Sequence, residues 1–238
     1  MQAILPIAGK SSRMAKKYQG PKQLLPVLGK PLVEYMLESL PEAIDELVLV
    51  VGGPYENDIR AYFGDEHGGR KISYVRQEQP LGLGHAIQQA KGLVKGRFII
   101  TAPDDIYNKA DLEKMIAEPD MAALTMKRDD WQNFGVFVLD ENGYIKKMVE
   151  KPKEFVSPYV SAGACYVLDQ EFFDVTVPPS ARGEIELPDI VNALINERGR
   201  KCKAIETSFW VAINDPDQLD VANEIMKARI ANQEKNNS

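Results

Sequence analysis

Two stretches of sequence decide the fold: AILPIAG at residues 3–9 and LVLVVGGP at residues 47–54. Each is a short apolar run that ends in small residues, as expected of a strand that is covered on both faces and then enters a loop. Between them Pro31 opens the segment PLVEYMLESL, in which apolar residues recur at helical spacing. The sequence therefore predicts two parallel strands joined by a helix.

The same alternation continues along the first half of the chain. The pattern predicts a helix over 56–63, a strand over 72–75, a helix from near His85, a strand over 97–102 and a helix capped by Asp111. This order predicts an α/β fold, a Rossmann-like, mostly parallel open sheet with helices on both faces. Because such sheets bind ligands at the carboxyl ends of their strands, the loops after Ile7, Val75 and Ala102 are candidate binding loops.

The second half of the chain has a different pattern. FGVFVLD and YIKKMVEK alternate apolar and polar residues on either side of Glu141-Asn142-Gly143, which is a hairpin signal. A strand, VSAGACYVL, a helix that stops at Gly199 and a strand, KCKAIE, are expected next, and NDPDQL then begins a final helix with Asp215 as its cap. A small antiparallel section is therefore expected after the parallel core.

The composition of the 238 residues is that of an ordinary folded protein, with 44% hydrophobic and 27% charged residues. The formal net charge of −6 gives no reason to expect binding to nucleic acid or to an anionic membrane. Cys165 and Cys202 lack the spacing of a zinc or redox motif and are typical of thiols in a reducing compartment. With no long apolar stretch in the sequence, we expect a cytoplasmic protein.

The loop Gly9-Lys10-Ser11-Ser12-Arg13 follows the first predicted strand. Its backbone N–H groups can converge on phosphate oxygens, and the guanidinium of Arg13 adds a forked donor. Neither GxGxxG nor GxxxxGK[ST] is present, so the loop by itself fits a structural turn equally well.

The stretch Gly20-Pro21-Lys22-Gln23-Leu24-Leu25-Pro26-Val27, followed by Lys30-Pro31-Leu32, gives that loop a context. Together they resemble the sugar-nucleotide pyrophosphorylases, the glucose-1-phosphate uridylyl- and thymidylyltransferases, whose signature is a G-x-G-T-R loop followed by P-K-x-L-L-P-V and K-P-L. Later blocks are similar to the same family in the same order: QEQPLGLGHA at 77–86, PDD at 103–105, FGV at 134–136, EKP at 150–152, SAG at 161–163 and RGEIEL at 182–187.

The resemblance implies an enzyme that transfers a nucleotidyl group from UTP or dTTP to a sugar 1-phosphate, glucose 1-phosphate by default, with Mg²⁺ as cofactor. It implies one domain over 1–238, with a nucleotide-binding core at 1–130, a sugar-binding section at 131–210 and a C-terminal helix at 211–238. The partners would be the two substrates, and the chain could also form a homo-oligomer. Two alternatives stay open: cytidylyl or guanylyl transfer to another phosphorylated acceptor, and a non-catalytic homologue that binds sugar nucleotides.

The resemblance also assigns roles to residues. The catalytic set is Arg13, Lys22 and Asp104. The nucleotide-binding set is Ala8, Gly9, Lys10, Ser11, Ser12, Gln77, Pro80 and Gly82, with Gln77 bonding the base. The substrate-binding set is Gly135, Glu150, Lys151, Val160 and Gly163, with Glu150 on a sugar hydroxyl and Lys151 on the sugar phosphate. His85 also matches a family position, but we expect it to be a structural residue beside the loop.

The sequence departs from the family pattern at two places. Ser11 replaces the second glycine of the phosphate loop, and Ala212 stands where W-x-D-x-G-T places a second metal-binding aspartate. Related N-acetylglucosamine-1-phosphate uridylyltransferases carry an asparagine ligand in a G-V-N-N segment. The expected metal ligands are therefore Asp104 together with Asn214 or Asp215.

Overall fold

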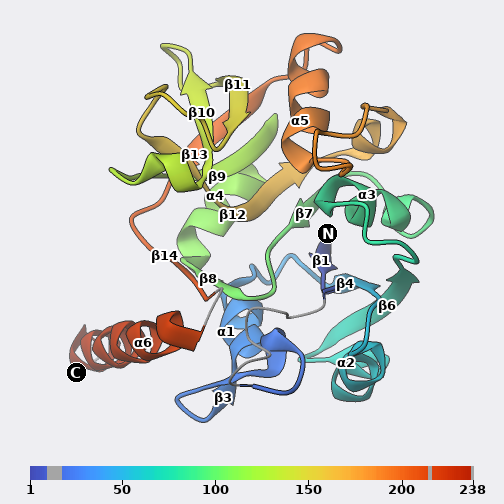
Figure 1. Cartoon of the computed structure of the whole chain (residues 1–238). Coiled ribbons are helices and arrows are strands. Elements are labelled where there is room, and N and C mark those ends of the chain that lie inside the picture. The colour runs from blue at the N-terminus through green and yellow to red at the C-terminus, as the bar shows by residue number, and fades with distance from the viewer. Residues whose placement is uncertain (10–17, 214–215, 237–238) are drawn as a thin grey trace.

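The computed structural model describes residues 1–9, 18–213 and 216–236, and Figure 1 gives the arrangement of its elements. One large sheet has the strand order β11-β10-β12-β7-β1-β4-β6-β5, with β9 beside β12 and β13 beside β9. The bounds of these strands are β1 Gln2–Pro6, β4 Glu46–Val51, β5 Glu66–His67, β6 Arg70–Arg76, β7 Phe98–Ile100, β9 Met121–Lys127, β10 Gly135–Leu139, β11 Ile145–Glu150, β12 Tyr159–Leu168 and β13 Cys202–Glu206.

The centre of the sheet is parallel, as the sequence predicted. Strands β7, β1, β4 and β6 lie side by side and run in one direction. The helices between and around them are α1 Leu32–Ser39, α2 Glu56–Phe63, α3 Leu83–Gln88, α4 Lys109–Ala117, α5 Leu187–Asn196 and α6 Pro216–Asn236, with short 3-10 turns at Lys22–Leu24, Gln89–Gly92, Trp131–Asn133 and Gln170–Asp174.

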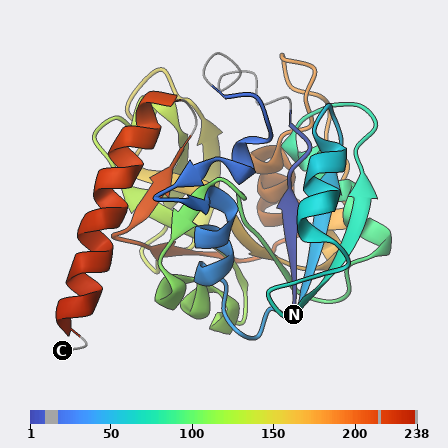
Figure 2. The same cartoon turned by 90° about the horizontal axis from the view of Figure 1, so that it is seen from below.

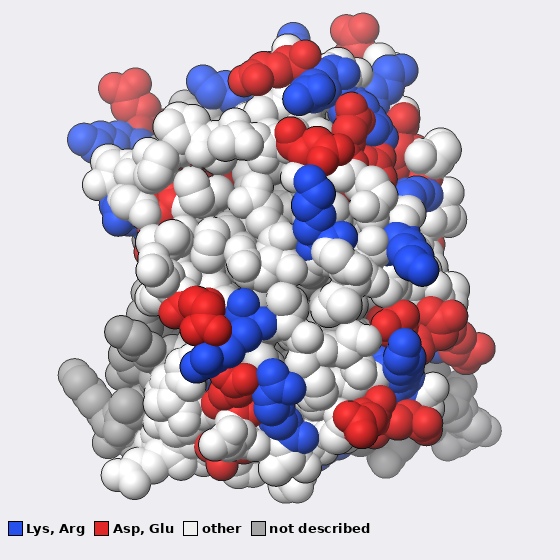
Figure 3. Space-filling model, turned by 90° about the vertical axis from the view of Figure 1, so that its right-hand side faces the viewer, with Lys and Arg blue, Asp and Glu red and all other residues white. Residues whose placement is uncertain are grey.

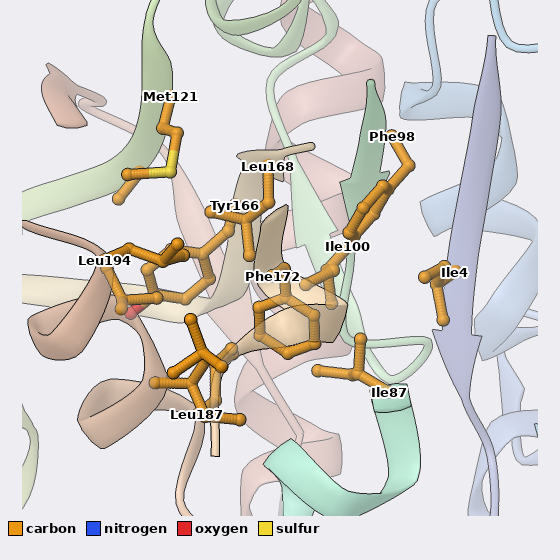
Figure 4. Packing of buried hydrophobic residues seen from close by; sticks show 14 of the residues in the cluster. Ile4, Ile87, Phe98, Ile100, Met121, Tyr166, Leu168, Phe172, Leu187 and Leu194 are labelled. Atoms are coloured by element: carbon orange, nitrogen blue, oxygen red, sulfur yellow. The ribbon is translucent and has the colours of Figure 1, made fainter. Parts of the chain in front are cut away.

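Both faces of the sheet are covered, and the buried positions of β1, β4 and β7 are apolar on both faces. On one face Leu5 and Leu49 contact a cluster that includes residues of α1, α2 and α4. On the other face Ile4 and Val50 belong to a cluster that includes residues of α3, α5 and the turn at Gln170–Asp174. Figure 4 shows this second cluster converging from the sheet and the helices. The continuous apolar runs thus supply two cores at once.

The antiparallel section is part of the same sheet. The predicted hairpin forms from β10 and β11. Strand β12 then runs antiparallel to β7, through pairs such as Tyr166 with Ile100, and to β10 and β9. Strand β9, which lies between β12 and β13, was not predicted from the sequence.

Two short ribbons lie outside the large sheet. Strand β8, Asp105–Tyr107, pairs with β14, Trp210–Ala212, and strand β2, Pro26–Val27, pairs with β3, Lys30–Pro31. Helix α6 is held to this side of the molecule by Ala222 and Met226, which join a cluster with residues of α1 and β8. The helix projects from the body in Figure 1 and runs along one side of it in Figure 2.

Two predicted helix boundaries were wrong. The side chain of Asn108, not Asp111, caps α4 by accepting from the backbone N–H of Ala110 at 3.3 Å. Asp111 lies inside the first turn, where its carboxylate accepts from Thr207 Oγ1 at 2.8 Å and pairs with Lys114. Helix α5 ends at Asn196, before the predicted stop at Gly199.

The surface on the α3 and α5 side carries both signs of charge. In Figure 3 most Lys and Arg side chains on this face lie near Asp and Glu side chains, and a broad uncharged area lies on the left and centre of the view. Among the helices that the structure describes, none is both long enough and apolar enough to cross a membrane. Cys165 and Cys202 are buried free thiols.

Candidate active site

A pocket of about 400 Å³ opens between the carboxyl end of β7 and the antiparallel section. Its walls come from the β7–β8 turn, β10, β11, β12, β14 and the start of α5. The lining residues are Leu83, Ala102, Asp104, Asp105, Asn133, Phe134, Gly135, Met148, Glu150, Lys151, Ser161, Gly163, Ala164, Tyr166, Glu186, Leu187, Pro188, Trp210 and Ala212. Five predicted site residues are among them: Asp104, Gly135, Glu150, Lys151 and Gly163.

The acidic turn after β7 forms the floor of the pocket. Asp104 makes an ion pair with Lys22, which lies in the 3-10 turn Lys22–Leu24, and each side chain is 15% exposed. The structure therefore brings together two of the residues that the sequence assigned to catalysis, although they are far apart in the chain. A lysine ammonium and a carboxylate at one place can meet a phosphate and a divalent cation, respectively.

Asp105 is buried beside Asp104, and the sequence reasoning gave it no separate role. Its Oδ2 accepts from Trp210 Nε1 at 2.8 Å and from Tyr107 Oη at 3.2 Å. Burial, and then the negative charge of Asp104, raise the pKa of Asp105 to about 8, while the bonds from Trp210 and Tyr107 and the charge of Lys22 act in the opposite direction. No local pattern marks this carboxyl, because Trp210 is distant in sequence.

The raised pKa of Asp105 predicts that the metal-free protein loses stability as the pH rises. The folded state keeps a proton up to about pH 8, whereas the unfolded chain releases it near the ordinary value of 3.8. The contribution is therefore fully present below about pH 4 and is lost towards pH 8, on the order of a few kcal/mol. Urea unfolding at pH 5 and pH 8, with chelator, should give a smaller difference for Asp105→Asn than for the wild type. Equal differences would contradict the assignment.

Gly163 has a structural reason to be glycine. Its φ is +68°, and a Cβ there would lie 2.1 Å from Asp105 Oδ2 and 2.8 Å from Tyr107 Oη. The register of β12 against β9 shifts between Ser161 and Tyr166, which carries the Gly163 backbone past these groups. The residue thus shapes the pocket wall by leaving room for the Asp105 carboxyl.

The opposite wall carries the residues that the sequence assigned to the sugar. Glu150 ends β11, and desolvation beside the pocket raises the pKa of its carboxyl against the opposing charge of Lys151. Lys151 has a φ of +42°, which is uncommon for a residue with a side chain, and its N–H donates to Phe134 O at 3.1 Å. Left-handed conformations at such residues occur preferentially at functional sites.

The predicted nucleotide loops begin at the carboxyl edge of the sheet, one on either side of β4. Ile7 N donates to Val50 O and Gln77 N donates to Val51 O, each at 2.9 Å, so Ala8, Gly9 and Gln77 leave the sheet together. Gly82 has a φ of +101°, and a Cβ there would lie 2.7 Å from Ile185 O. Pro80 is exposed on the same loop.

Among the described residues, the predicted substrate-binding residue Val160 does not line the pocket. Val160 is 0% exposed within the sheet, and its carbonyl accepts from Thr125 Oγ1 at 2.8 Å. Ala212 does line the pocket, directly opposite Asp105 in the β14–β8 ribbon. Lys10, Ser11, Ser12, Arg13, Asn214 and Asp215 lie outside the described residues, as does the predicted Asp215 cap.

The acidic turn fits a hard divalent cation. Within residues 1–9, 18–213 and 216–236 no group of three or more His, Cys, Asp or Glu side chains could hold a metal ion. Mg²⁺, however, usually keeps several waters and takes one or two protein carboxylates together with substrate phosphates. Asp104, lining an open pocket, supplies a donor of that kind.

Known proteins match both the sequence and the fold. The nucleotidyl transferase family model matches residues 8–228. The bifunctional protein GlmU of Methanococcus vannielii is 34% identical over 95% of this chain and 55% of its own length. The UTP–glucose-1-phosphate uridylyltransferase AglF of Haloferax volcanii is 31% identical over 94% of this chain and 96% of its own length.

Solved structures agree. A Bacillus anthracis protein assigned as a glucose-1-phosphate thymidylyltransferase, solved with sucrose, has a TM-score of 0.81 at 26% identity, with 94% of each chain covered. A UDP-glucose pyrophosphorylase solved with UDP-glucose shares the fold, with a TM-score of 0.83 at 22% identity over 96% of this chain and 98% of that one.

A parallel sheet with an acidic pocket at its carboxyl edge, and this match over most of the chain, define a nucleotidyltransferase fold. The chain belongs to the nucleotidyl transferase family. Members of that family generally use a divalent metal ion. The chain spans about half the length of GlmU relatives such as that of M. vannielii, of which it covers 55%.

Proposed function

We propose that this chain transfers a uridylyl or thymidylyl group from UTP or dTTP to a sugar 1-phosphate, with release of pyrophosphate and formation of a nucleoside diphosphate sugar. The observation that carries the proposal is the pocket itself. Its floor holds Asp104 in an ion pair with Lys22, and its opposite wall holds Glu150 and Lys151. One cavity therefore offers charges for both phosphates of the proposed reaction.

The phosphate side of the site is assigned to Lys22 and Asp104. Lys22 places a positive charge beside the triphosphate, and Asp104 would hold Mg²⁺, with Arg13 and Asn214 or Asp215 as further proposed members. When bound, Mg²⁺ would neutralise charge on the phosphate oxygens. The side chain of Ala212 lines the pocket but has no metal-binding group. The protein ligands of Mg²⁺ would therefore come from Asp104 and from Asn214 or Asp215.

The acceptor side is assigned to the β10–β11–β12 wall. Glu150 would accept from a sugar hydroxyl, and Lys151 would meet the phosphate of the sugar. Glucose 1-phosphate is the proposed acceptor, since AglF bears that substrate in its name and the B. anthracis structure is assigned to the same sugar phosphate. The nucleotide side is completed by Gln77 and the loop that follows it.

The proposed chemistry does not require a general base. The attacking group is a phosphate oxygen that is already ionised near neutral pH, so the protein has to align it with the α-phosphate and offset the developing charge. Lys22, beside Asp104, and Lys151 would supply the positive charge for this. His85 does not line the pocket and instead bonds Gln77 beside the proposed base loop.

A pyrophosphate-release assay tests the proposal. Four nucleoside triphosphates crossed with several sugar 1-phosphates, with Mg²⁺, should give the highest kcat/KM with UTP or dTTP and glucose 1-phosphate. Turnover confined to CTP or GTP with another phosphorylated acceptor would instead support the alternative reaction, cytidylyl or guanylyl transfer. Absence of turnover across the whole panel would favour a homologue that binds sugar nucleotides without converting them.

A cytoplasmic location is part of the proposal. Both cysteines are buried free thiols, which suits a reducing compartment. Both proposed substrates are small anions, and the net charge of −6 gives no general attraction to nucleic acid or anionic lipid. We therefore propose that the anionic substrates bind through positively charged side chains at the pocket.

A further inference from the structure

The amide of Gln77 is held at two points. The residue is 7% exposed, and Nε2 lies 3.1 Å from Gly82 O and 3.0 Å from His85 Nδ1. A carbonyl oxygen can only accept a hydrogen bond, so the group that faces Gly82 O is the NH₂ group of the amide. Its two hydrogens are thus committed to Gly82 and His85.

The amide oxygen of Gln77 is in a different situation. Within the part of the chain that the structure describes, it has no hydrogen-bond partner, and the side-chain polar atom that is sealed from solvent without a partner is Arg229 Nη1. Gln77 Oε1 is therefore not sealed and reaches the surface of the loop. Gln77 can offer an acceptor to a ligand, while its donors are occupied.

The bond from Gln77 requires a particular form of His85. Nδ1 accepts, so in the neutral ring Nε2 carries the proton. Gln89 Nε2 lies 3.2 Å from His85 Nε2 and 3.0 Å from His85 O. Gln89 can keep its bond to His85 O while the longer contact between the two Nε2 atoms goes without a hydrogen bond, whereas Gln77 Nε2 is held by both Gly82 and His85. The Gln77 contact therefore sets the protonated nitrogen of the ring.

We propose that His85 is a positioning residue for base selection: it holds the Gln77 amide so that only the oxygen is presented to the base. This inference rests on the proposed function and on contact between Gln77 and the base. Uracil and thymine carry a ring N–H between two carbonyl groups, and that N–H can donate to Gln77 Oε1. Cytosine has an unprotonated ring nitrogen at the same place, which repels an acceptor. His85 thus favours UTP and dTTP over CTP without touching the base.

The test compares UTP with CTP in variants of His85. His85→Phe keeps a ring but removes the acceptor, so the Gln77 amide can turn, and the ratio of kcat/KM for UTP to that for CTP should fall about tenfold. His85→Asn keeps an acceptor oxygen near the position of Nδ1 and should retain most of the ratio. Gln88→Ala is the matched control, because Gln88 lies on α3 but bonds Val175 O at 3.0 Å.

Two further measurements make the result independent of turnover and of folding of the Phe variant. Calorimetry measures the preference for UTP over CTP as a difference in binding affinity. If the protein shows no turnover but still prefers UTP in binding, the proposed function is contradicted and the positioning role of His85 is not. Nitrogen-15 NMR of the histidines, with His85→Asn to assign His85, should give a proton on Nε2. The positioning role is overturned if His85→Phe keeps the UTP preference in kcat/KM and binding, if His85→Asn loses it equally, or if Nδ1 carries the proton.

Discussion

Replacing Asp104 by alanine should lower the rate of pyrophosphate release about a thousandfold, the loss expected when one preorganised electrostatic contact to the reacting phosphates is removed. Asp104 lines the pocket and pairs with Lys22, so its removal takes away the carboxylate proposed for the cation and one partner of the lysine. The measurement is kcat/KM under the best conditions of the substrate panel. Chelation of divalent ions should bring the wild type down to a similar level.

The matched control for this change is Asp174→Ala. Asp174 also pairs with a lysine, Lys91, at 2.9 Å, but it lies away from the pocket and is largely exposed. Its loss should leave turnover unchanged. The urea-unfolding free energies of both variants should stay close to that of the wild type. More than a tenth of wild-type turnover in Asp104→Ala would contradict the role assigned to Asp104.

Gly163→Ala should destabilise the fold by about 4 kcal/mol, which combines the cost of a left-handed residue with that of overpacking. The added methyl group would lie 2.1 Å from Asp105 Oδ2. The buried carboxyl and Trp210, which bonds it, would have to move together. Urea or thermal unfolding at fixed pH measures the change.

Gly199→Ala separates the two contributions to that loss. Gly199 has a φ of +66°, close to that of Gly163, but a Cβ there meets no atom within 4 Å. Its replacement should therefore cost only the conformational part, about 1 kcal/mol. If the two variants lost the same stability, the contact with Asp105 would not be the reason for glycine at position 163.

The parallel core could be predicted because its signals are local. LVLVV at 47–51 is apolar at every position, as a strand with two covered faces must be, and the helix over 56–63 matches α2 residue for residue. Strand β9 was missed in MAALTMK, whose alanines have low strand propensity and gain their burial from β12 and β13. Tertiary pairing, rather than local preference, makes that segment a strand.

The candidate site divides in the same way. Asp104, Glu150 and Lys151 lie in motifs, and the structure places all three on one pocket. The role of Asp105 depends on Trp210 and on the shifted register near Gly163, which arise only when distant segments meet. The role proposed for His85 depends in the same way on its contact with Gln77, since a histidine at the start of a helix carries no local signal of that contact.

The continuity of the large sheet limits how this molecule can move. Strand β12 pairs with β7 through Tyr166 and Ile100 and with β10 through Val160 and Val136. Backbone hydrogen bonds therefore link the strand that leads to the acidic turn with the antiparallel strands on the other side of the pocket. A hinge between the walls would have to break backbone bonds in the middle of a buried sheet. Opening and closing around a substrate therefore fall to the loops at the rim, and amide exchange should be fast there and slow throughout β7 and β12.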